Sequence, residues 1–307
     1  MGLAFSDIYI EQVRAQVLIF MYKEKESLIC TLFLFVLLPY LLTVLILGRE
    51  ACPVSREFPA EEYVPAVTAS QISWDYSKET IKAQTIAART NLYVRHGEKE
   101  ENSTILQAAE NIRKLEMDSI MLEKYRVFQE AARETEGQVL KYQDQMREIP
   151  YHALSAGKTR GGKEILGEDY GYIASVDASK DIDSPLYVEG CYFSESDLEK
   201  QIKKEYPGFI FGEKKKAEIK NTDSVGYVME IEIGNMEFQG EQLKELLNLP
   251  SSCFTIQRLE GEIRFLCRGI GHGMGISQYT AEQMALEGKK YEEILQYFFP
   301  EMVIEEQ

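Results

Sequence analysis

The feature that most constrains this chain is an uninterrupted apolar run near its start. Residues 28–47 read LICTLFLFVLLPYLLTVLIL and contain no charged side chain. At a rise of about 1.5 Å per residue, a helix of this length spans the hydrocarbon core of a bilayer, about 30 Å. A buried core helix would carry a polar face, and a cleaved signal peptide would have a shorter apolar core and a small-residue cleavage site. The run therefore predicts a retained transmembrane anchor over residues 27–48.

The anchor divides the chain into parts with different surroundings. Slightly more basic residues lie just before the run than just after it, which favours a cytoplasmic N-terminus. We therefore expect a cytoplasmic tail at 1–26, a linker at 49–57 and an extracytoplasmic domain at 58–307. The predicted location is the cell membrane, crossed once.

The charge of the chain argues against one class of function. It has 50 Asp and Glu against 34 Lys and Arg, a formal net charge of −16. Binding to a nucleic-acid backbone needs clustered basic side chains, so we expect no nucleic-acid partner. Hydrophobic residues make up 45% of the chain, which is enough to build a packed core in the outer domain.

The five cysteines do not form a metal-binding or redox motif. No two are spaced as CxxC, and Cys30 lies within the predicted anchor. The other four could pair, but their wide spacing favours buried free thiols: Cys52, Cys191, Cys253 and Cys267. We expect no metal and no cofactor.

Hydrophobic periodicity predicts several helices in the outer domain. Apolar residues recur at helical spacing over 61–71 and 77–92, and again in a helical segment at 103–134 that follows a polar loop at 96–103. A capping-box sequence at 196–199 predicts the start of a further helix. The second of these helices carries many alanines on its apolar side, so we expect it to be a central packing helix.

Strands are predicted after Gly137, where the period changes to two. The predicted strands are 138–142, 146–154, 185–193, 225–233 and a hairpin over 253–267. A loop at 269–275 and two helices between Ser277 and Phe299 follow. The sequence therefore predicts an α+β class, with mixed helices and antiparallel strands after the transmembrane helix.

The C-terminal segment 268–279 carries the most distinctive motif, RGIGHGMGISQY. Its alternating glycines permit tight backbone corners and close approach to a ligand. His272 lies between two of them and brings a titratable ring to whatever cleft forms there. The alternative is a glycine-rich turn whose histidine binds a backbone carbonyl, which is about as common.

This segment resembles the signature of the SpoIID (stage II sporulation protein D) family. Two further blocks resemble the same family in the same order. The first comprises EEYVPAVTASQ at 61–71 and KAQTIAART at 82–90, and the middle block comprises AARETEGQVL at 131–140 and HALSAGKT at 152–159. Three ordered blocks are far harder to obtain by chance than one short motif. Residues 195–250 match poorly and are interpreted as an insertion.

The resemblance implies a substrate and a reaction. Members of this family are lytic transglycosylases that cut the glycan strands of peptidoglycan with one glutamate. This acid protonates the leaving glycosidic oxygen and then acts as a base while an anhydro ring closes. The family interval leads here to Gln71, whose amide keeps the shape and hydrogen bonding of glutamate but cannot transfer a proton. The resemblance therefore implies a sporulation pseudoenzyme with impaired chemistry.

Three interpretations of the outer domain remain open. The first is a membrane-anchored protein that binds glycan strands and cuts them slowly or not at all. The second is a working enzyme that uses another acid, of which Asp75 beside Trp74 is the best candidate, although a solvated helix-end acid is the commoner role. The third is a non-enzymatic protein whose helical segment 103–134 contacts a partner, such as an active wall hydrolase or a sporulation complex.

Six further residues occupy matched motif positions and are predicted to line the same cleft as Gln71 and to bind glycan: His152, Ser155, His272, Ser277, Gln278 and Tyr279. The alternative is a satisfied structural network. Several family members carry cysteine near the middle-block histidine, where it could hold a metal. Ala153 and Leu154 follow His152 here, so we assign no metal.

Overall fold

The computed structural model describes residues 60–95, 99–212 and 217–307, and of residues 99–104 only the backbone. The predicted anchor at 27–48, with its tail and linker, lies outside these residues. Within the described ranges no helix is both long enough and apolar enough to cross a membrane. The anchor, its orientation and the membrane location therefore stay predictions. Residues 58–307 form one compact unit.

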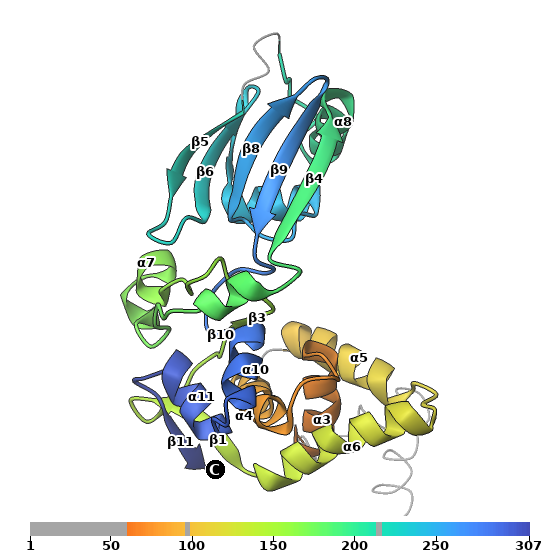
Figure 1. The fold of residues 1–307 in the computed structure, drawn as a ribbon, viewed down its shortest axis with the longest axis vertical. Coiled ribbons are helices and arrows are strands. Elements are labelled where there is room, and N and C mark those ends of the chain that lie inside the picture. Colours follow the sequence, from red (N-terminus) through yellow and green to blue (C-terminus); the bar gives the residue numbers. More distant parts are fainter. Residues whose placement is uncertain (1–59, 96–98, 213–216) are drawn as a thin grey trace, which may run out of the picture. The chain divides into compact units, whose positions relative to one another are not determined.

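Four helices build the first part of this unit (Figure 1): α3 Ala60–Gln71, α4 Lys78–Val94, α5 Lys99–Arg113 and α6 Ser119–Glu134. The small side chains of α4 let its neighbours approach closely, and it contacts α3, α6, α10, α11 and β1. It is the central packing helix that the sequence predicted. The polar loop predicted at 96–103 is partly wrong, because α5 already begins at Lys99. The lysine and glutamates there are good helix formers despite their polarity.

Short strands connect the helices to the C-terminus. Strand β1, Gln138–Tyr142, pairs antiparallel with β2, Gln145–Met146, and with β11, Val303–Glu306. The single strand predicted over 146–154 is wrong. Pro150 lacks an amide donor and interrupts it, and the next strand, β3 Tyr151–His152, pairs in parallel with β10, Ile276–Ser277.

Two antiparallel three-stranded sheets form the second part. The first sheet has the order β4-β9-β8 and the second β5-β6-β7. Their strands and the helices packed on them are β4 Val188–Ser194, α8 Glu195–Glu205, β5 Ala217–Thr222, β6 Val228–Ile233, β7 Met236–Gln239, α9 Gly240–Leu247, β8 Phe254–Leu259 and β9 Glu262–Arg268. The predicted hairpin over 253–267 is confirmed as β8 and β9. The cap of α8 is Ser194, which accepts from the amide of Asp197, rather than Ser196 as predicted.

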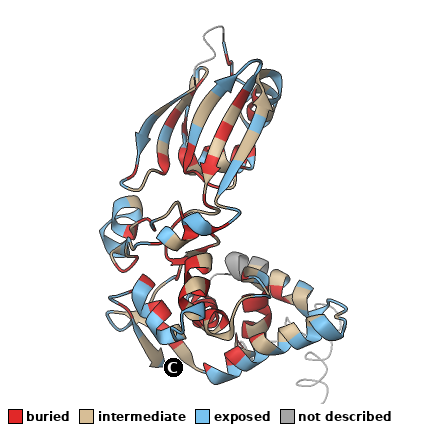
Figure 2. Cartoon of the chain, in the orientation of Figure 1, coloured by how far each residue is buried: buried red, intermediate tan, exposed pale blue. Residues whose placement is uncertain are grey.

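The poorly matched residues 195–250 form regular secondary structure that is part of the folded domain. They supply α8, β5, β6, β7 and α9, and these pack into one hydrophobic core with β8 and β9. A second core lies around α4 and the closing helices α10, Gln278–Leu286, and α11, Tyr291–Phe298 (Figure 2). One α-helix, α7 Gly162–Leu166, and two 3₁₀ helices, Glu168–Tyr170 and Ser179–Asp183, lie between β3 and β4. The mixed helix and antiparallel-strand α+β class is confirmed.

The cysteines within the described ranges are free, as predicted. Cys253 and Cys267 are buried and Cys191 is half-buried. Burial raises the pKa of all three thiols, that of Cys267 to about 12. A raised pKa keeps a thiol protonated and unreactive at neutral pH. Cys52 lies outside the described residues.

Candidate functional site

A cavity of about 310 Å³ lies where three distant parts of the sequence meet. Its lining comes from α3, α4, α5, the segment before β3 and the glycine-rich loop: Gln71, Asn91, Arg95, Ile105, Glu148, Ile149, Pro150, Tyr151 and His272. Gln71 belongs to the first motif block, Tyr151 adjoins the middle block, and His272 belongs to the C-terminal block. The cavity thus brings Gln71 of the first block together with His272 of the C-terminal block, whereas His152, Ser155, Ser277, Gln278 and Tyr279 are not among its lining residues.

A second hollow, of about 680 Å³, lies among α3, α5 and α6. Its lining includes Glu62, Arg113, Met117 and Tyr125, and none of the predicted catalytic or glycan-binding residues. Size alone favours this hollow, but the smaller cavity holds the titratable ring and the motif residues. We therefore take the smaller cavity as the candidate functional site.

Gln71 is fixed by two other glutamines. It is the last residue of α3, and its Oε1 accepts a hydrogen bond from Gln84 Nε2 at 3.0 Å. Its main-chain carbonyl accepts from Gln278 Nε2 at 2.9 Å, and Gln278 Nε2 also lies 3.3 Å from Gln84 Oε1. This network uses Oε1 of Gln71. The amide nitrogen is therefore the group that this side chain can offer to a ligand in the cavity.

The cavity wall contains one carboxylate, Glu148, which pairs with Arg95. Asp75 does not line the cavity. Its side chain is 75% exposed and pairs with Lys124 of α6. The neighbouring Trp74 packs against Tyr125 and Phe128, and its indole donates to the carbonyl of Ala69 at 2.8 Å. This tryptophan thus belongs to the helical packing rather than to a sugar-binding platform.

His272 reaches the cavity from the glycine-rich loop. Its Nδ1 accepts a hydrogen bond from the amide of Met274 at 3.1 Å, so the proton of the neutral ring lies on Nε2. Burial lowers the pKa of His272 below its usual range, and nearby Glu241 acts in the opposite direction. A hydrogen bond to the backbone of Tyr151 also acts against the lowering, and since Nδ1 is an acceptor this bond belongs to Nε2–H. The ring is therefore neutral at neutral pH, with its proton on Nε2 and directed to Tyr151 in the cavity wall.

His152 is buried behind His272, with ring centroids 5.8 Å apart. Its Nδ1 lies 2.9 Å from the carbonyl of Met274, which can only accept, so Nδ1 carries the proton. Its Nε2 is buried without a hydrogen-bond partner. Burial, with a smaller effect from His272, lowers the pKa of His152 to about 3. His152 is thus a neutral ring that holds the loop and carries one unused acceptor.

Ser155 and Ser277 both form hydrogen bonds with a buried acid, Asp181, which the sequence analysis did not identify. The amide of Ser155 donates to Asp181 at 2.6 Å, and the hydroxyl of Ser277 donates to both carboxylate oxygens at 2.7 and 2.8 Å. Thr280 adds a third donor at 2.7 Å. These residues are fully or almost fully buried and do not line the cavity. No motif contains Asp181, which lies in a 3₁₀ helix between the matched blocks.

The remaining motif residues support the cavity from behind. Gln278 is buried and holds the main chain at Gln71. The amide of Tyr279 donates to the carbonyl of Ala153 at 3.2 Å and so ties α10 to the middle block. A second buried acid, Glu282, accepts from Ser77 and Thr80 at the start of α4. Ser77 thus occupies the predicted N-cap position, but its hydroxyl bonds Glu282 rather than a helix amide.

Binding of a metal ion requires several ligating side chains close together. Residues 60–95, 99–212 and 217–307 contain no group of three or more His, Cys, Asp or Glu side chains that could hold an ion. His152 and His272 approach each other, but both Nδ1 atoms are taken by the backbone of Met274.

Comparisons with known proteins agree with the motifs. The family model of stage II sporulation protein matches residues 49–142. Stage II sporulation protein D of Bacillus amyloliquefaciens is 27% identical over 82% of this chain and 75% of its own length. The protein of that name from Bacillus subtilis (strain 168) is 27% identical over 82% and 76%. An uncharacterized protein of Brachyspira hyodysenteriae is 24% identical over 80% and 66%.

Proposed function

Because the chain belongs to the SpoIID family, we propose that its cavity binds peptidoglycan glycan strands and that Gln71 leaves it with impaired lytic transglycosylase chemistry. The observation that carries this proposal is the position of Gln71 in the cavity wall, where the one carboxylate among the described lining residues, Glu148, is paired with Arg95. The names of the two Bacillus relatives support sporulation as the setting.

The cavity groups suit the hydroxyl and acetamido groups of a glycan. The Gln71 amide nitrogen is a donor, the Glu148 carboxylate is an acceptor, and the Tyr151 hydroxyl can act as either. A cavity of about 310 Å³ is at the small end of ligand sites, which favours a short portion of a strand. Binding needs only these hydrogen bonds, whereas cleavage needs a proton donor that becomes a base.

Asp75 is a poor substitute for the missing acid. Its carboxylate is exposed to solvent and already paired with Lys124. It also lies outside the lining of the cavity. The proposal therefore does not depend on a displaced acid.

The decisive experiment compares the full-length protein with its Gln71→Glu variant. A glutamate would accept the hydrogen bond of Gln84 as Gln71 does, so the substitution restores an acid without repacking. We expect the variant to cleave glycan strands about 10²–10⁴ times faster than the natural protein. Both are incubated with peptide-bearing and peptide-free strands, and anhydro-muramic ends are counted by mass spectrometry.

The control is Gln129→Glu, which adds the same charge on the exposed side of α6. It should leave cleavage unchanged. Equal cleavage by the natural protein and Gln71→Glu would show that the acid lies elsewhere. Absence of glycan binding by the natural protein would remove the glycan part of the proposal.

A second candidate function is contact with a protein partner, and the surface of α5 and α6 favours it. Leu115, Ile120 and Leu122 are 45%, 67% and 43% exposed at the turn between these helices, beside the hollow of about 680 Å³. An active wall hydrolase that supplies the missing chemistry is the partner we propose. Exposed apolar clusters mark protein contacts more often than isolated apolar residues do.

The double variant Ile120→Asp, Leu122→Asp tests this contact, because two charges oppose burial of the patch. We expect it to lose co-purification with the hydrolase at unchanged glycan affinity. The matched control is Leu286→Asp on α10, where Leu286 is 67% exposed and lies outside the helical segment 103–134. Undiminished co-purification of the double variant would rule the contact out.

A further inference from the structure

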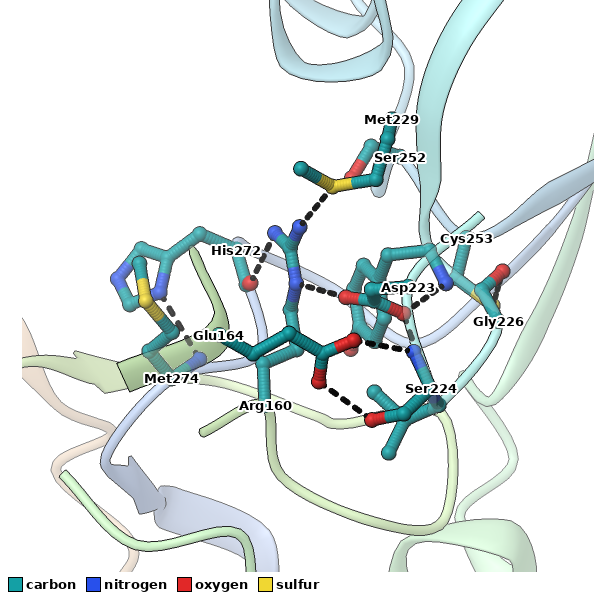
Figure 3. Close-up of polar contacts among 12 residues, drawn as sticks. Arg160, Glu164, Asp223, Ser224, Gly226, Met229, Ser252, Cys253, His272 and Met274 are labelled. Carbon is teal, nitrogen blue, oxygen red and sulfur yellow. Dashed lines mark hydrogen bonds and ion pairs between the residues drawn. The ribbon is translucent and has the colours of Figure 1, made fainter. Parts of the chain in front are cut away.

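Arg160 is a buried cation that none of the three motif blocks predicts as a site residue. The residue is 1% exposed and lies just before α7 (Figure 3). Its Nε donates to Asp223 at 2.6 Å, and its Nη1 donates to Glu241 at 2.9 Å. The same Nη1 donates to the carbonyl of His272 at 3.1 Å. A buried guanidinium with charge-assisted bonds of this kind is a rigid anchor.

Three successive carbonyls of the glycine-rich loop each accept one hydrogen bond. The carbonyl of His272 accepts from the Arg160 side chain, and that of Gly273 accepts from the Arg160 amide at 2.8 Å. The carbonyl of Met274 accepts from His152 Nδ1. Arg160 thus supplies two of the three bonds that these carbonyls accept, at His272 and at the residue after it.

Tyr227 fixes the position of the guanidinium itself. The guanidinium lies over the Tyr227 ring, 4.7 Å from its centroid, and the Tyr227 hydroxyl accepts from the amide of Ala156 at 3.2 Å. The other side of the ring meets the loop, because a Cβ on Gly273 would lie 2.4 Å from the hydroxyl oxygen. Arg160, Tyr227 and Gly273 therefore form a packed stack behind His272.

The acids that hold Arg160 come from residues 195–250, which match the family poorly. Asp223 lies between β5 and β6, and Glu241 lies in the first turn of α9. Glu164 adds a parallel link, since it accepts from the amide and the hydroxyl of Ser224 next to Asp223 (Figure 3). Arg160 therefore bonds both the strand-rich part of the domain and the glycine-rich loop.

We propose that Arg160 is the positioning residue of the glycan site: it fixes the His272 backbone so that the ring keeps its place in the cavity wall with its proton on Nε2. The inference rests on the proposed glycan binding, and it adds a role for Asp223 and Glu241 as the groups that orient Arg160. A merely structural ion pair would stabilise the domain equally well. It would not control the tautomer of His272 or the affinity for glycan.

The first test reads the histidine rings directly in the full-length protein labelled with ¹⁵N-histidine. The chain has three histidines, so their NMR signals can be assigned by single substitution. In the natural protein His272 should show the Nε2–H tautomer alone. In Arg160→Met we expect a mixture of tautomers and a titration midpoint shifted upward, toward the ordinary value. An unchanged His272 spectrum in a folded variant would overturn the proposal.

The matched control is Arg264→Met. Arg264 also lies over a tyrosine ring, that of Tyr192 at 5.8 Å, and its Nη1 donates to the Tyr192 hydroxyl at 3.2 Å. It lies on β9 and makes no contact with the glycine-rich loop. The His272 spectrum should be the same in this control as in the natural protein.

A second measurement needs no variant and so does not depend on folding of Arg160→Met. The natural protein is labelled with ¹⁵N-arginine and with ¹³C at the carbonyls of histidine and alanine. A scalar coupling across the hydrogen bond from Arg160 Nη1 to the His272 carbonyl is expected. Its absence, with the coupling from Arg89 Nη2 to the Ala132 carbonyl detected, would overturn the proposal.

Glycan affinity separates this inference from the proposed function. If the natural protein binds glycan strands, Arg160→Met should bind about tenfold more weakly, equivalent to about 1.4 kcal/mol, and Arg264→Met should bind normally. Equal affinity of Arg160→Met and the natural protein would refute the positioning role. If the natural protein binds no glycan, the proposed function fails, and the His272 tautomer alone decides the role of Arg160.

Discussion

At the scale of single residues, the side chains of the site lack a group that can transfer a proton at neutral pH. Gln71 has no titratable proton, Nδ1 of His272 is taken by a backbone amide, and His152 is kept neutral by burial. Two of these three side chains would be acids or bases in water near neutral pH. In the folded domain none of them is poised to transfer a proton at pH 7. This arrangement suits binding better than acid–base catalysis.

His152 gives this argument a dependence on pH. Its pKa is about 3 in the folded protein and about 6.5 in an unfolded chain, so the unfolded chain binds more protons between these values. Its contribution to stability is fully present above pH 6.5 and is lost as the pH falls toward 3. The expected slope from this one group is at most about 1.4 kcal/mol per pH unit. Urea unfolding at a series of pH values between 7 and 4 measures it.

The comparison for this titration is His152→Gln, which keeps a hydrogen-bond donor for the carbonyl of Met274 but has no group that titrates. The variant should lose stability less steeply than the natural protein as the pH falls. Identical slopes for the two proteins would show that His152 does not titrate in this range.

At the scale of elements, the glycine-rich loop requires glycine because of its backbone angles and because of its close packing. Gly271, Gly273 and Gly275 all have positive φ angles, of +106°, +77° and +70°. A side chain at Gly273 would also collide with Tyr227, and one at Gly275 would collide with the carbonyl of Pro150. The loop therefore needs glycine for two separate reasons, and the second was not visible in the sequence.

Two alanine substitutions separate these reasons. Gly288→Ala meets nothing within 4 Å and bears only the strain of φ +92°, about 1–2 kcal/mol. Gly273→Ala bears similar strain and must also displace the Tyr227 ring, which adds about 1–3 kcal/mol. Chemical denaturation should therefore show the larger loss for Gly273→Ala. Equal losses would mean that Tyr227 moves aside freely.

The periodicity of the sequence predicted those helices and strands whose formation depends mainly on interactions within one segment. The 138–142 strand, the hairpin over 253–267 and the helix after Ser277 follow from periodicity and turn residues, and the structure contains them. The strands β5 and β7 were missed. Strand β5 is mostly exposed and alternates over only four residues, Ala217 to Lys220, and β7 has only four residues. Their pairing with β6 depends on contacts that a single segment does not encode.

At the scale of the whole described domain, the motifs predicted which residues lie near one another. They did not predict which of these residues line the cavity and which form buried hydrogen bonds. Gln71 and His272 do line one cavity, whereas Ser155 and Ser277 bind Asp181 behind it. The supporting acids Asp181 and Asp223 lie outside the motifs, and their partners are up to about 100 residues away in the sequence. Long-range pairs of this kind carry no local periodicity, so the sequence could not place them.

The same domain is proposed to stand outside the cell membrane, held by residues 27–48. The uncharged run supports this, and its position just before the domain leaves only the linker 49–57 between them. We expect Ser119→Cys, on the exposed start of α6, to react with a membrane-impermeant maleimide in intact spheroplasts. Ser6→Cys should react only after lysis, because positive residues before the run favour a cytoplasmic N-terminus.

Both reporters are made in a Cys52→Ser background, in which Cys253 and Cys267 are buried and Cys191 is half-buried with a raised pKa. Their low reactivity leaves each introduced thiol as the main target of the reagent. Labelling of Ser6→Cys in intact spheroplasts, or recovery of the protein in the soluble fraction, would contradict the anchor. Labelling of Ser119→Cys alone would place the glycan cavity on the side of the membrane where peptidoglycan lies.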